Sequence, residues 1–235
     1  MPTRPRPPAG AARTERHQHG PTQARTDAGA DKPAPLYLAS QSPRRRQLLD
    51  QLGVAHQLLL PAADEDAEAL EAVHPGELPA DYVRRVTALK LRAAVARRKA
   101  RGLPPAPVLC ADTTVALGRR ILGKPADADE ARASLQALAG RSHRVLTAVA
   151  VHDGRRTRQA LSVSSVRFAA LPPAVLDAYI ASGDCFGKAG AYAIQSALGG
   201  WVARIAGSYS GIMGLPLFET AQLLQASRVP MALTP

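Results

Sequence analysis

The sequence has few of the residues and segments that mark three common classes of protein. Its two cysteines, Cys110 and Cys185, are too few for a disulfide scaffold and too far apart for a CxxC redox or zinc motif. No apolar run reaches the roughly 18 residues that a membrane-spanning helix needs. A Walker A loop, GxxxxGK(S/T), is also missing. The sequence therefore predicts neither a disulfide-stapled protein, nor a membrane protein, nor a P-loop NTPase.

Aromatic and acidic residues are also scarce. Phe, Trp and Tyr make up 4% of the chain, and 30 Lys and Arg residues face 19 Asp and Glu residues, which leaves a net charge of +11. Such an excess of positive charge indicates an anionic partner. A nucleic-acid-binding protein is one alternative, because the chain contains the basic runs Arg97-Arg98-Lys99 and Arg155-Arg156. The low aromatic content and the lack of a recognised nucleic-acid-binding motif are evidence against it.

The hydrophobic residues, 46% of the 235, are enough for a buried core but are unevenly distributed. Residues 1–35 contain no Leu, Ile, Val or Phe, and they contain seven prolines and six basic residues against three acids. Such a stretch buries nothing and lacks the apolar segment of a secretory signal. We expect residues 1–35 to be a disordered, basic, proline-rich tail, dispensable for the fold, and residues 36–229 to form the folded domain.

From Leu36 onward, strand and helix patterns alternate, and adjacent strands follow later, which predicts a mixed α/β sheet. Ser42 and Pro43 favour the start of a helix and Gly53 its end. Asp127 and Glu130 form a capping-box pattern at the start of another helix. The expected strands are 36–40, 56–60, 108–117, 144–152, 161–168 and 201–206, and the expected helices are 42–53, 80–101, 127–140, 172–182 and 215–226.

The segment from Ser40 to Arg46 lies at a predicted strand-to-helix junction. The first turn of a helix presents unpaired N–H groups and the positive end of the helix dipole, so Arg44 and Arg45 oppose the dipole there. A bound anion would explain their position. An ordinary solvated basic turn is the alternative.

Asp112 lies in an apolar strand pattern, where a carboxylate needs a partner, a metal ion or a catalytic role. The alternative is an Asp that caps a turn at the strand end. Lys90 lies beside the apolar face of the long helix, where it could simply extend toward solvent. The adjacent acids Asp64 and Glu65 could help to hold Mg²⁺, or could belong to a solvated acidic loop.

Three glycine-containing segments could contact a ligand, although each is also compatible with an ordinary loop. Lys124, between Gly and Pro, could reach a phosphate. The small residues of 187–195 would let a ligand approach the backbone, and the Gln195 amide can both donate to and accept from a base edge. The Gly- and Ser-rich segment 207–216 could cradle an anion.

Taken in chain order, these motifs resemble those of the Maf (septum formation inhibitor) family, over about residues 36–226. The resemblance implies a fold similar to inosine triphosphate pyrophosphatases, an elongated, mixed, twisted sheet with flanking helices and a deep central cleft. It also implies a metal-dependent nucleoside triphosphate pyrophosphatase, which releases pyrophosphate and a nucleoside monophosphate. The matching segments are Leu38-Ala39-Ser40, Ser42-Pro43-Arg44-Arg45, Ala111-Asp112-Thr113, Gly123-Lys124-Pro125, Gly140-Arg141-x-His143, Lys188-Ala189-Gly190-x-Tyr192-x-Ile194-Gln195, Gly207-Ser208-Tyr209 and Gly214-Leu215-Pro216.

The resemblance implies a role for each matching residue. Asp112 would be the catalytic proton acceptor, and a divalent cation, Mg²⁺ or Mn²⁺, would be held by Asp112 and Glu65. Gln195 resembles the branch that acts on dTTP and UTP, whereas a Glu there would resemble the branch that acts on 7-methyl-GTP. Substrate choice would rest on Arg44, Thr113 and Gln195, and phosphate binding on Ser42, Arg45, Lys90, Lys124 and Lys188.

The sequence departs from the family pattern at two positions, neither of which is a proposed catalytic group. Ala139 stands where the family usually has Ser, and Ser196 stands where Gly is common. We expect an enzyme that hydrolyses dTTP and UTP, with modified pyrimidine nucleotides as further candidate substrates. We expect it to be a cytoplasmic homodimer, with no stable nucleic-acid partner and no membrane partner. The alternative is a non-catalytic nucleic-acid-binding or cell-division regulatory protein, which the presence of Asp112, Lys124 and Gln195 disfavours.

Overall fold

The computed structural model describes residues 36–62, 65 and 69–233. The tail expected over residues 1–35 and the candidate acid Asp64 lie outside these residues. Cys110 and Cys185 are both free and buried.

Within the described residues, seven strands form one mixed sheet, which confirms the α/β prediction. The strands are β1 (Tyr37–Leu38), β2 (Gln57–Leu58), β3 (Val108–Leu117), β4 (Arg120–Leu122), β5 (Ser142–His152), β6 (Thr157–Phe168) and β7 (Val202–Ala206). Their order is β2-β1-β3-β5-β6-β7, with β4 paired to β3 outside this path. β1 runs parallel to β2 and β3, and the other pairings are antiparallel.

The long strands β5 and β6 form a hairpin, as the adjacent strand patterns predict. The turn between them is held by Asp153, whose Oδ1 accepts hydrogen bonds from the backbone N–H groups of Arg155 (2.9 Å) and Arg156 (2.8 Å). This turn accounts for one of the basic runs that had suggested nucleic-acid binding. β6 begins at Thr157, earlier than the apolar pattern alone indicated.

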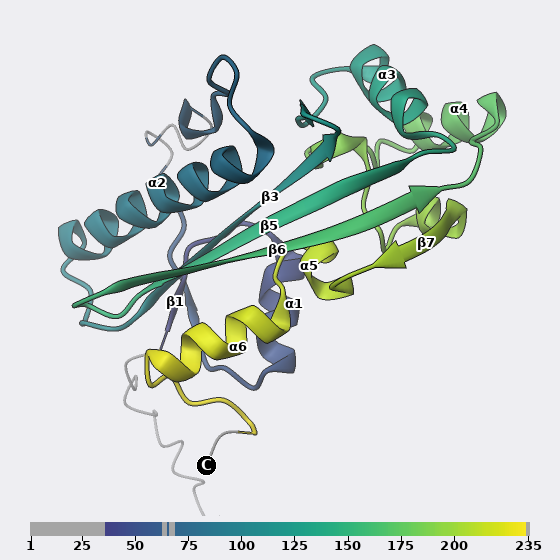
Figure 1. Cartoon of the computed structure of the whole chain (residues 1–235). Coiled ribbons are helices and arrows are strands. Elements are labelled where there is room, and N and C mark those ends of the chain that lie inside the picture. Colours follow the sequence, from purple (N-terminus) through teal and green to yellow (C-terminus); the bar gives the residue numbers. More distant parts are fainter. Residues whose placement is uncertain (1–35, 63–64, 66–68, 234–235) are drawn as a thin grey trace, which may run out of the picture. The chain divides into compact units, whose positions relative to one another are not determined.

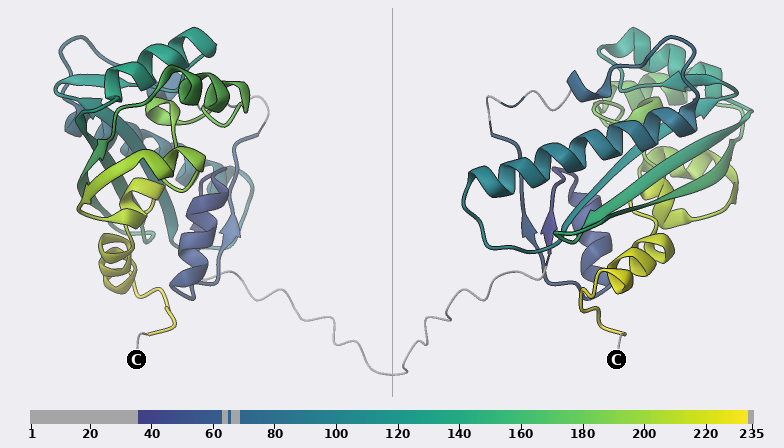
Figure 2. Two further views of the ribbon diagram at one scale, coloured as in Figure 1. Left: turned by 90° about the vertical axis from the view of Figure 1, so that its right-hand side faces the viewer. Right: turned by 60° about the vertical axis from the view of Figure 1, so that its left-hand side comes forward.

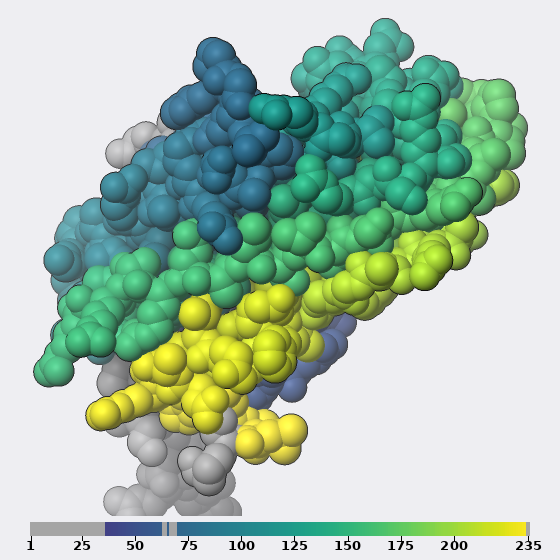
Figure 3. Space-filling model, viewed as in Figure 1, coloured from purple at the N-terminus to yellow at the C-terminus, as the bar shows by residue number. Residues whose placement is uncertain are grey.

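The helices cover both faces of the sheet (Figures 1 and 2). One face packs against α2 through Leu91, Ala94, Val83 and Val86. The other face packs against α1 and α6, and farther along against α3 and α4. Figure 3 shows the side chains of β6 as a band between those of α2 and α6. The helices are α1 (Pro43–Gln51), α2 (Pro79–Ala100), α3 (Ala128–Leu138), α4 (Pro173–Ala181), α5 (Tyr209–Met213) and α6 (Leu217–Ala226), with 3-10 turns η1 (Ala69–Glu71), η2 (Ala189–Ala191) and η3 (Ala197–Trp201).

The helix termini follow the sequence signals closely. Asp127 Oδ1 accepts from the N–H of Glu130 at 2.8 Å, which confirms the predicted cap of α3. The last turn of α2 contains Arg97, Arg98 and Lys99, where cations interact favourably with the helix dipole. That second basic run therefore also has a structural explanation. Ser42 occupies the N-cap position of α1, but its side chain makes no capping hydrogen bond.

The edge of β3 is interrupted in a way that positions the site. On the side away from β5, β3 pairs with β1 only at residues 108–109 and with β4 only at 115–117. Between these pairings no described strand lies beside it. Because successive side chains of a strand point to opposite faces, Asp112 and Thr113 approach this open edge from the two faces of the sheet.

Candidate active site

A cavity of about 710 Å³ opens at the interrupted edge of β3. This volume lies within the roughly 300–1,000 Å³ that small-molecule sites occupy. Every site residue predicted from the sequence lines it, although the residues come from separate segments of the chain. They are Ser42, Arg44, Arg45, Glu65, Lys90, Asp112, Thr113, Lys124, Lys188 and Gln195. Of the Gly- and Ser-rich segment 207–216, only Ile212, Met213 and Gly214 line it.

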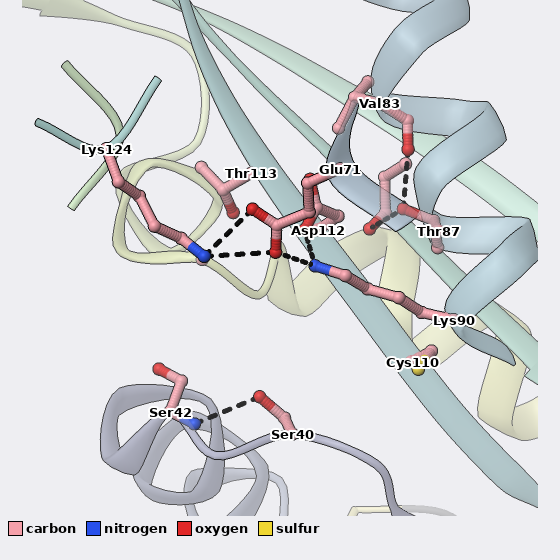
Figure 4. Close-up of polar contacts among 12 residues, drawn as sticks. Ser40, Ser42, Glu71, Val83, Thr87, Lys90, Cys110, Asp112, Thr113 and Lys124 are labelled. Atoms are coloured by element: carbon pink, nitrogen blue, oxygen red, sulfur yellow. Dashed lines mark hydrogen bonds and ion pairs between the residues drawn. The ribbon is translucent and has the colours of Figure 1, made fainter. Parts of the chain in front are cut away.

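At the centre of the cavity wall, two carboxylates meet one ammonium group. Lys90 Nζ, on α2, lies 2.6 Å from Asp112 Oδ1 and 2.6 Å from Glu71 Oε1. Lys124 Nζ lies 2.9 Å from Glu71 Oε2. Figure 4 shows the four side chains pointing toward one another, with Thr113 beside them. Lys90 is therefore part of an ion-pair cluster, and its ammonium group does not simply extend into solvent.

The cluster stabilises the charges of its own members. Burial by itself would lower the pKa of Lys90, but Asp112 and Glu71 outweigh burial and raise it above its ordinary value. Burial would likewise raise the pKa of Glu71, but Lys90 and Lys124 outweigh it and lower that pKa. The cavity thus holds a fixed set of opposite charges in a partly desolvated environment, where electrostatic interactions are stronger than in water.

Asp112 is placed for chemistry. It lies in the middle of β3 with 8% of its surface exposed, so it does not cap a turn at a strand end. Its Oδ1 accepts from Lys90, whereas its Oδ2 has no protein partner in the described part of the chain. That second oxygen can accept a proton or a hydrogen bond from a water molecule in the cavity.

The two arginines at the start of α1 have different environments. Arg45 is turned inward: its Nε donates to the carbonyl of Gly214 (2.8 Å), and its two terminal nitrogens donate to Ser40 Oγ and Thr113 Oγ1 (3.2 Å each). Burial lowers the pKa of Arg45. Arg44 lines the cavity without an ion pair to any described residue. With no side chain capping α1, its first-turn N–H groups remain available to an anion.

Glu65, the acid expected to help hold a metal ion, forms an ion pair with Arg97. Both its carboxylate oxygens lie within 2.9 Å of Arg97 Nε, and Arg97 lowers the pKa of Glu65 to about 2. The acid that reaches the Asp112–Lys90 pair is Glu71, which our sequence reasoning missed. Nothing in the sequence distinguishes Glu71 from its neighbouring acids. Across the described residues, no group of three or more His, Cys, Asp or Glu side chains is arranged to hold a metal ion on its own.

The segment 188–195 forms another part of the cavity wall. The N–H of Gly190 donates to the carbonyl of Gly123 at 2.9 Å, which joins this wall to the loop that carries Lys124. Lys188 is bound to Asp184. Gln195 is exposed on the cavity lining, and its amide makes no hydrogen bond with any described residue. It is free to bind a ligand.

A carboxylate on the open edge of a mixed sheet, in a cavity that lysines and arginines also line, suits an enzyme that hydrolyses phosphoanhydrides. The chain belongs to the Maf family, since the family model described as "Maf-like protein" matches residues 35–227. This confirms the resemblance found in the motifs.

Curated relatives are similar over nearly their whole length. A protein of Polaromonas sp. named "dTTP/UTP pyrophosphatase" is 62% identical over 192 residues, which cover 82% of this chain and 95% of that protein. A protein of Albidiferax ferrireducens with the same name is 62% identical over 191 residues, 81% of this chain and 96% of that protein. A third of that name, from Ralstonia nicotianae, is 61% identical over 197 residues, 83% of this chain and 95% of that protein.

Proposed function

We propose that this chain hydrolyses dTTP and UTP, together with modified pyrimidine nucleoside triphosphates, to the nucleoside monophosphate and pyrophosphate. The observation that carries the proposal is the convergence of Asp112, Lys90, Glu71 and Lys124 on the open edge of β3. The names of the relatives indicate the same substrates. Gln195 lines the same cavity, and its side-chain N–H can donate to the O4 carbonyl of thymine or uracil.

In the proposed reaction, a water molecule attacks the α-phosphorus. Asp112 Oδ2 accepts the proton of that water while its oxygen forms the new bond to phosphorus. The bond from the α-phosphorus to the bridging oxygen breaks, and pyrophosphate leaves with the electron pair. Lys124, Arg44 and the first-turn N–H groups of α1 border the cavity where negative charge would gather, and fixed positive groups of this kind stabilise such a transition state.

We also propose that a divalent cation, Mg²⁺ or Mn²⁺, takes part. Asp112 and Glu71 fit this role, because one oxygen of each lies 2.6 Å from the same ammonium and hard cations prefer carboxylate oxygens. Mg²⁺ commonly uses one or two carboxylates and completes its shell with water and substrate phosphates. When bound, the cation would supply positive charge to the phosphate oxygens. The assignment of Glu65 stays a prediction.

The function is tested by measuring pyrophosphate release by the purified chain, with Mg²⁺ or Mn²⁺, from dTTP, UTP, CTP, GTP, 7-methyl-GTP and ITP. We expect dTTP and UTP to give the highest kcat/KM. A preference for 7-methyl-GTP would keep the enzyme but contradict the role of Gln195. Absence of turnover with every nucleotide and both metals would overturn the proposal.

No helix in the described ranges combines the length and apolar character needed to cross a membrane. The homodimer, the cytoplasmic location and the lack of a stable nucleic-acid partner stay predictions. Light scattering of the purified chain tests the first of them.

A further inference from the structure

A continuous chain of hydrogen bonds runs under one wall of the cavity. Arg45 Nη2 donates to Thr113 Oγ1 at 3.2 Å, Thr113 Oγ1 and Thr147 Oγ1 are 2.9 Å apart, and Thr147 Oγ1 donates to the carbonyl of Gly211 at 2.7 Å. Thr113 and Thr147 are directly opposite each other on β3 and β5. Thr113 lines the cavity, whereas Thr147 lies beneath it with 1% of its surface exposed.

The chemistry of the two ends fixes the direction of every hydrogen bond in this chain. A carbonyl oxygen can only accept, and two oxygens 2.7 Å apart repel unless a hydrogen lies between them, so Thr147 places its single hydroxyl hydrogen on Gly211. Thr147 then has no hydrogen left for Thr113, and Thr113 must donate to Thr147. At the other end, the guanidinium of Arg45 can only donate.

The result is that Thr113 has no hydrogen to offer a ligand. Its only hydroxyl hydrogen is committed to Thr147, and one lone pair accepts from Arg45. The second lone pair is then all that this hydroxyl can offer to a group in the cavity, which Thr113 lines. A group that lies against Thr113 must therefore be a hydrogen-bond donor, and an acceptor placed there would face a second lone pair and lose its own bond to water.

Pyrimidine bases differ at this point. Uracil and thymine carry a hydrogen on ring atom N3, whereas N3 of cytosine carries a lone pair. We propose that Thr147 fixes Thr113 as an obligatory acceptor, and that this acceptor selects bases with an N3–H group, uracil and thymine, over cytosine. The proposal rests on the proposed function, which places a pyrimidine triphosphate in this cavity. Thr147 is a positioning residue, since it acts on the base only through Thr113.

The test removes the Thr147 hydroxyl and leaves Thr113 intact. Thr147→Val keeps the shape of the side chain, and the Gly211 carbonyl retains a hydrogen bond from the N–H of Gly214 at 3.1 Å. In this variant the Thr113 hydrogen can turn toward the cavity and donate to cytosine N3. We expect the ratio of kcat/KM for UTP to that for CTP to fall about 10- to 100-fold, mainly because CTP is used better.

The matched control is Thr147→Ser, which keeps the hydroxyl and loses only a methyl group, and which should keep the wild-type ratio. Thr147→Ala replaces Thr147→Val if the latter does not fold. An unchanged ratio in the variant without the hydroxyl overturns the proposal. So does an equal loss for UTP and CTP, which would show that Thr147 only supports the fold.

A second measurement separates this proposal from the proposed function. Binding of the non-hydrolysable α,β-methylene analogues of UTP and CTP reports base selection without turnover, and we expect the same shift in their Kd ratio. A wild-type chain that binds the UTP analogue selectively but releases no pyrophosphate would overturn the enzymatic function alone. A chain that turns over dTTP and UTP, with a ratio insensitive to Thr147→Val, would overturn the role of Thr147 alone.

Discussion

The charged cluster around Lys90 contains two carboxylates, Asp112 and Glu71, with different environments. Asp112 and Glu71 share one ammonium, yet only Asp112 keeps an oxygen without a protein partner among the described residues, since Glu71 Oε2 contacts Lys124. A carboxylate that must accept a proton needs such an oxygen. The geometry therefore favours Asp112 as the base and Glu71 as a group that orients Lys90 and Lys124.

Replacing Asp112 tests this assignment. Asp112→Asn keeps the size of the side chain but removes the proton acceptor, so kcat for dTTP should fall by about 10²- to 10⁴-fold. Binding of the α,β-methylene analogue should remain measurable by calorimetry. The control is Asp177→Asn, an exposed carboxylate on α4 paired with Arg132 outside the cavity, which should retain wild-type turnover. An active Asp112→Asn enzyme would contradict the role of Asp112.

Glu71 and Glu65, the two acids that could hold the cation together with Asp112, can be compared directly. Glu71→Gln should weaken Mn²⁺ binding, measured by electron paramagnetic resonance with the nucleotide analogue present, by roughly 10-fold or more. Glu65→Gln, whose carboxylate is bound by Arg97, should change it much less. The opposite order of effects would assign the metal to Glu65, as the sequence resemblance implies.

At the scale of helices and strands, the sequence predicted the long elements better than the short ones. The apolar pattern of β3 predicted its bounds, 108–117, which were confirmed. The capping box at Asp127 located the start of α3, which spans Ala128–Leu138 and is slightly shorter than predicted. β4 and α5 were not predicted, because three- and five-residue elements contain too little periodicity. β4 exists because Gly118, with φ +61°, permits a two-residue turn that returns the chain along β3.

The sequence predicted those site residues that lie in recognisable motifs. Asp112, Lys124 and Gln195 were found in this way, and the fold brings them to one cavity. Glu71 was missed because its role depends on a contact with Lys90, which the packing of η1 on α2 creates. The hydrogen-bond direction at Thr113 was also beyond the sequence, since it depends on atoms from separate elements.

The turn η2 carries a prediction of its own. Gly190 has φ +66°, and a Cβ there would lie 2.8 Å from Val115 Cγ1. Gly190→Ala should therefore lower the free energy of unfolding by about 1–3 kcal/mol and reduce turnover, because η2 borders the cavity. Urea unfolding followed by circular dichroism measures the first effect.

Gly187→Ala is the matched control for this variant. Its φ is nearly the same, +67°, but an added Cβ meets no atom within 4 Å. It should cost only the backbone strain, about 1 kcal/mol. Equal losses of stability in the two variants would show that the contact with Val115 contributes nothing.

At the scale of the whole molecule, one buried histidine links stability to pH. His143, with 2% of its surface exposed, packs against Phe168 and Tyr192, and its Nε2 lies 2.7 Å from the Tyr192 hydroxyl. Burial lowers the pKa of His143 from 6.5 to about 4. The folded chain therefore holds His143 neutral at a pH at which the unfolded chain has already bound the proton.

The sign of the effect follows from this difference. The stabilisation is fully present above about pH 6.5 and is lost as the pH falls toward 4, with a loss on the order of 3 kcal/mol over that range. Urea unfolding at pH 7.0 and pH 4.5 measures it. His143→Gln keeps a partner for the Tyr192 hydroxyl but cannot titrate, so its stability should fall less between the two pH values than that of the wild type.

Carboxylates also titrate between pH 7.0 and 4.5, so the pH dependence of wild-type stability does not by itself identify His143. The comparison between variants does. Tyr192→Phe leaves His143 buried and should keep the wild-type dependence on pH, because burial and not the hydroxyl is the main cause of the lowered pKa. If His143→Gln and the wild type lose the same free energy of unfolding between pH 7.0 and 4.5, His143 is not the residue that makes the fold sensitive to acid.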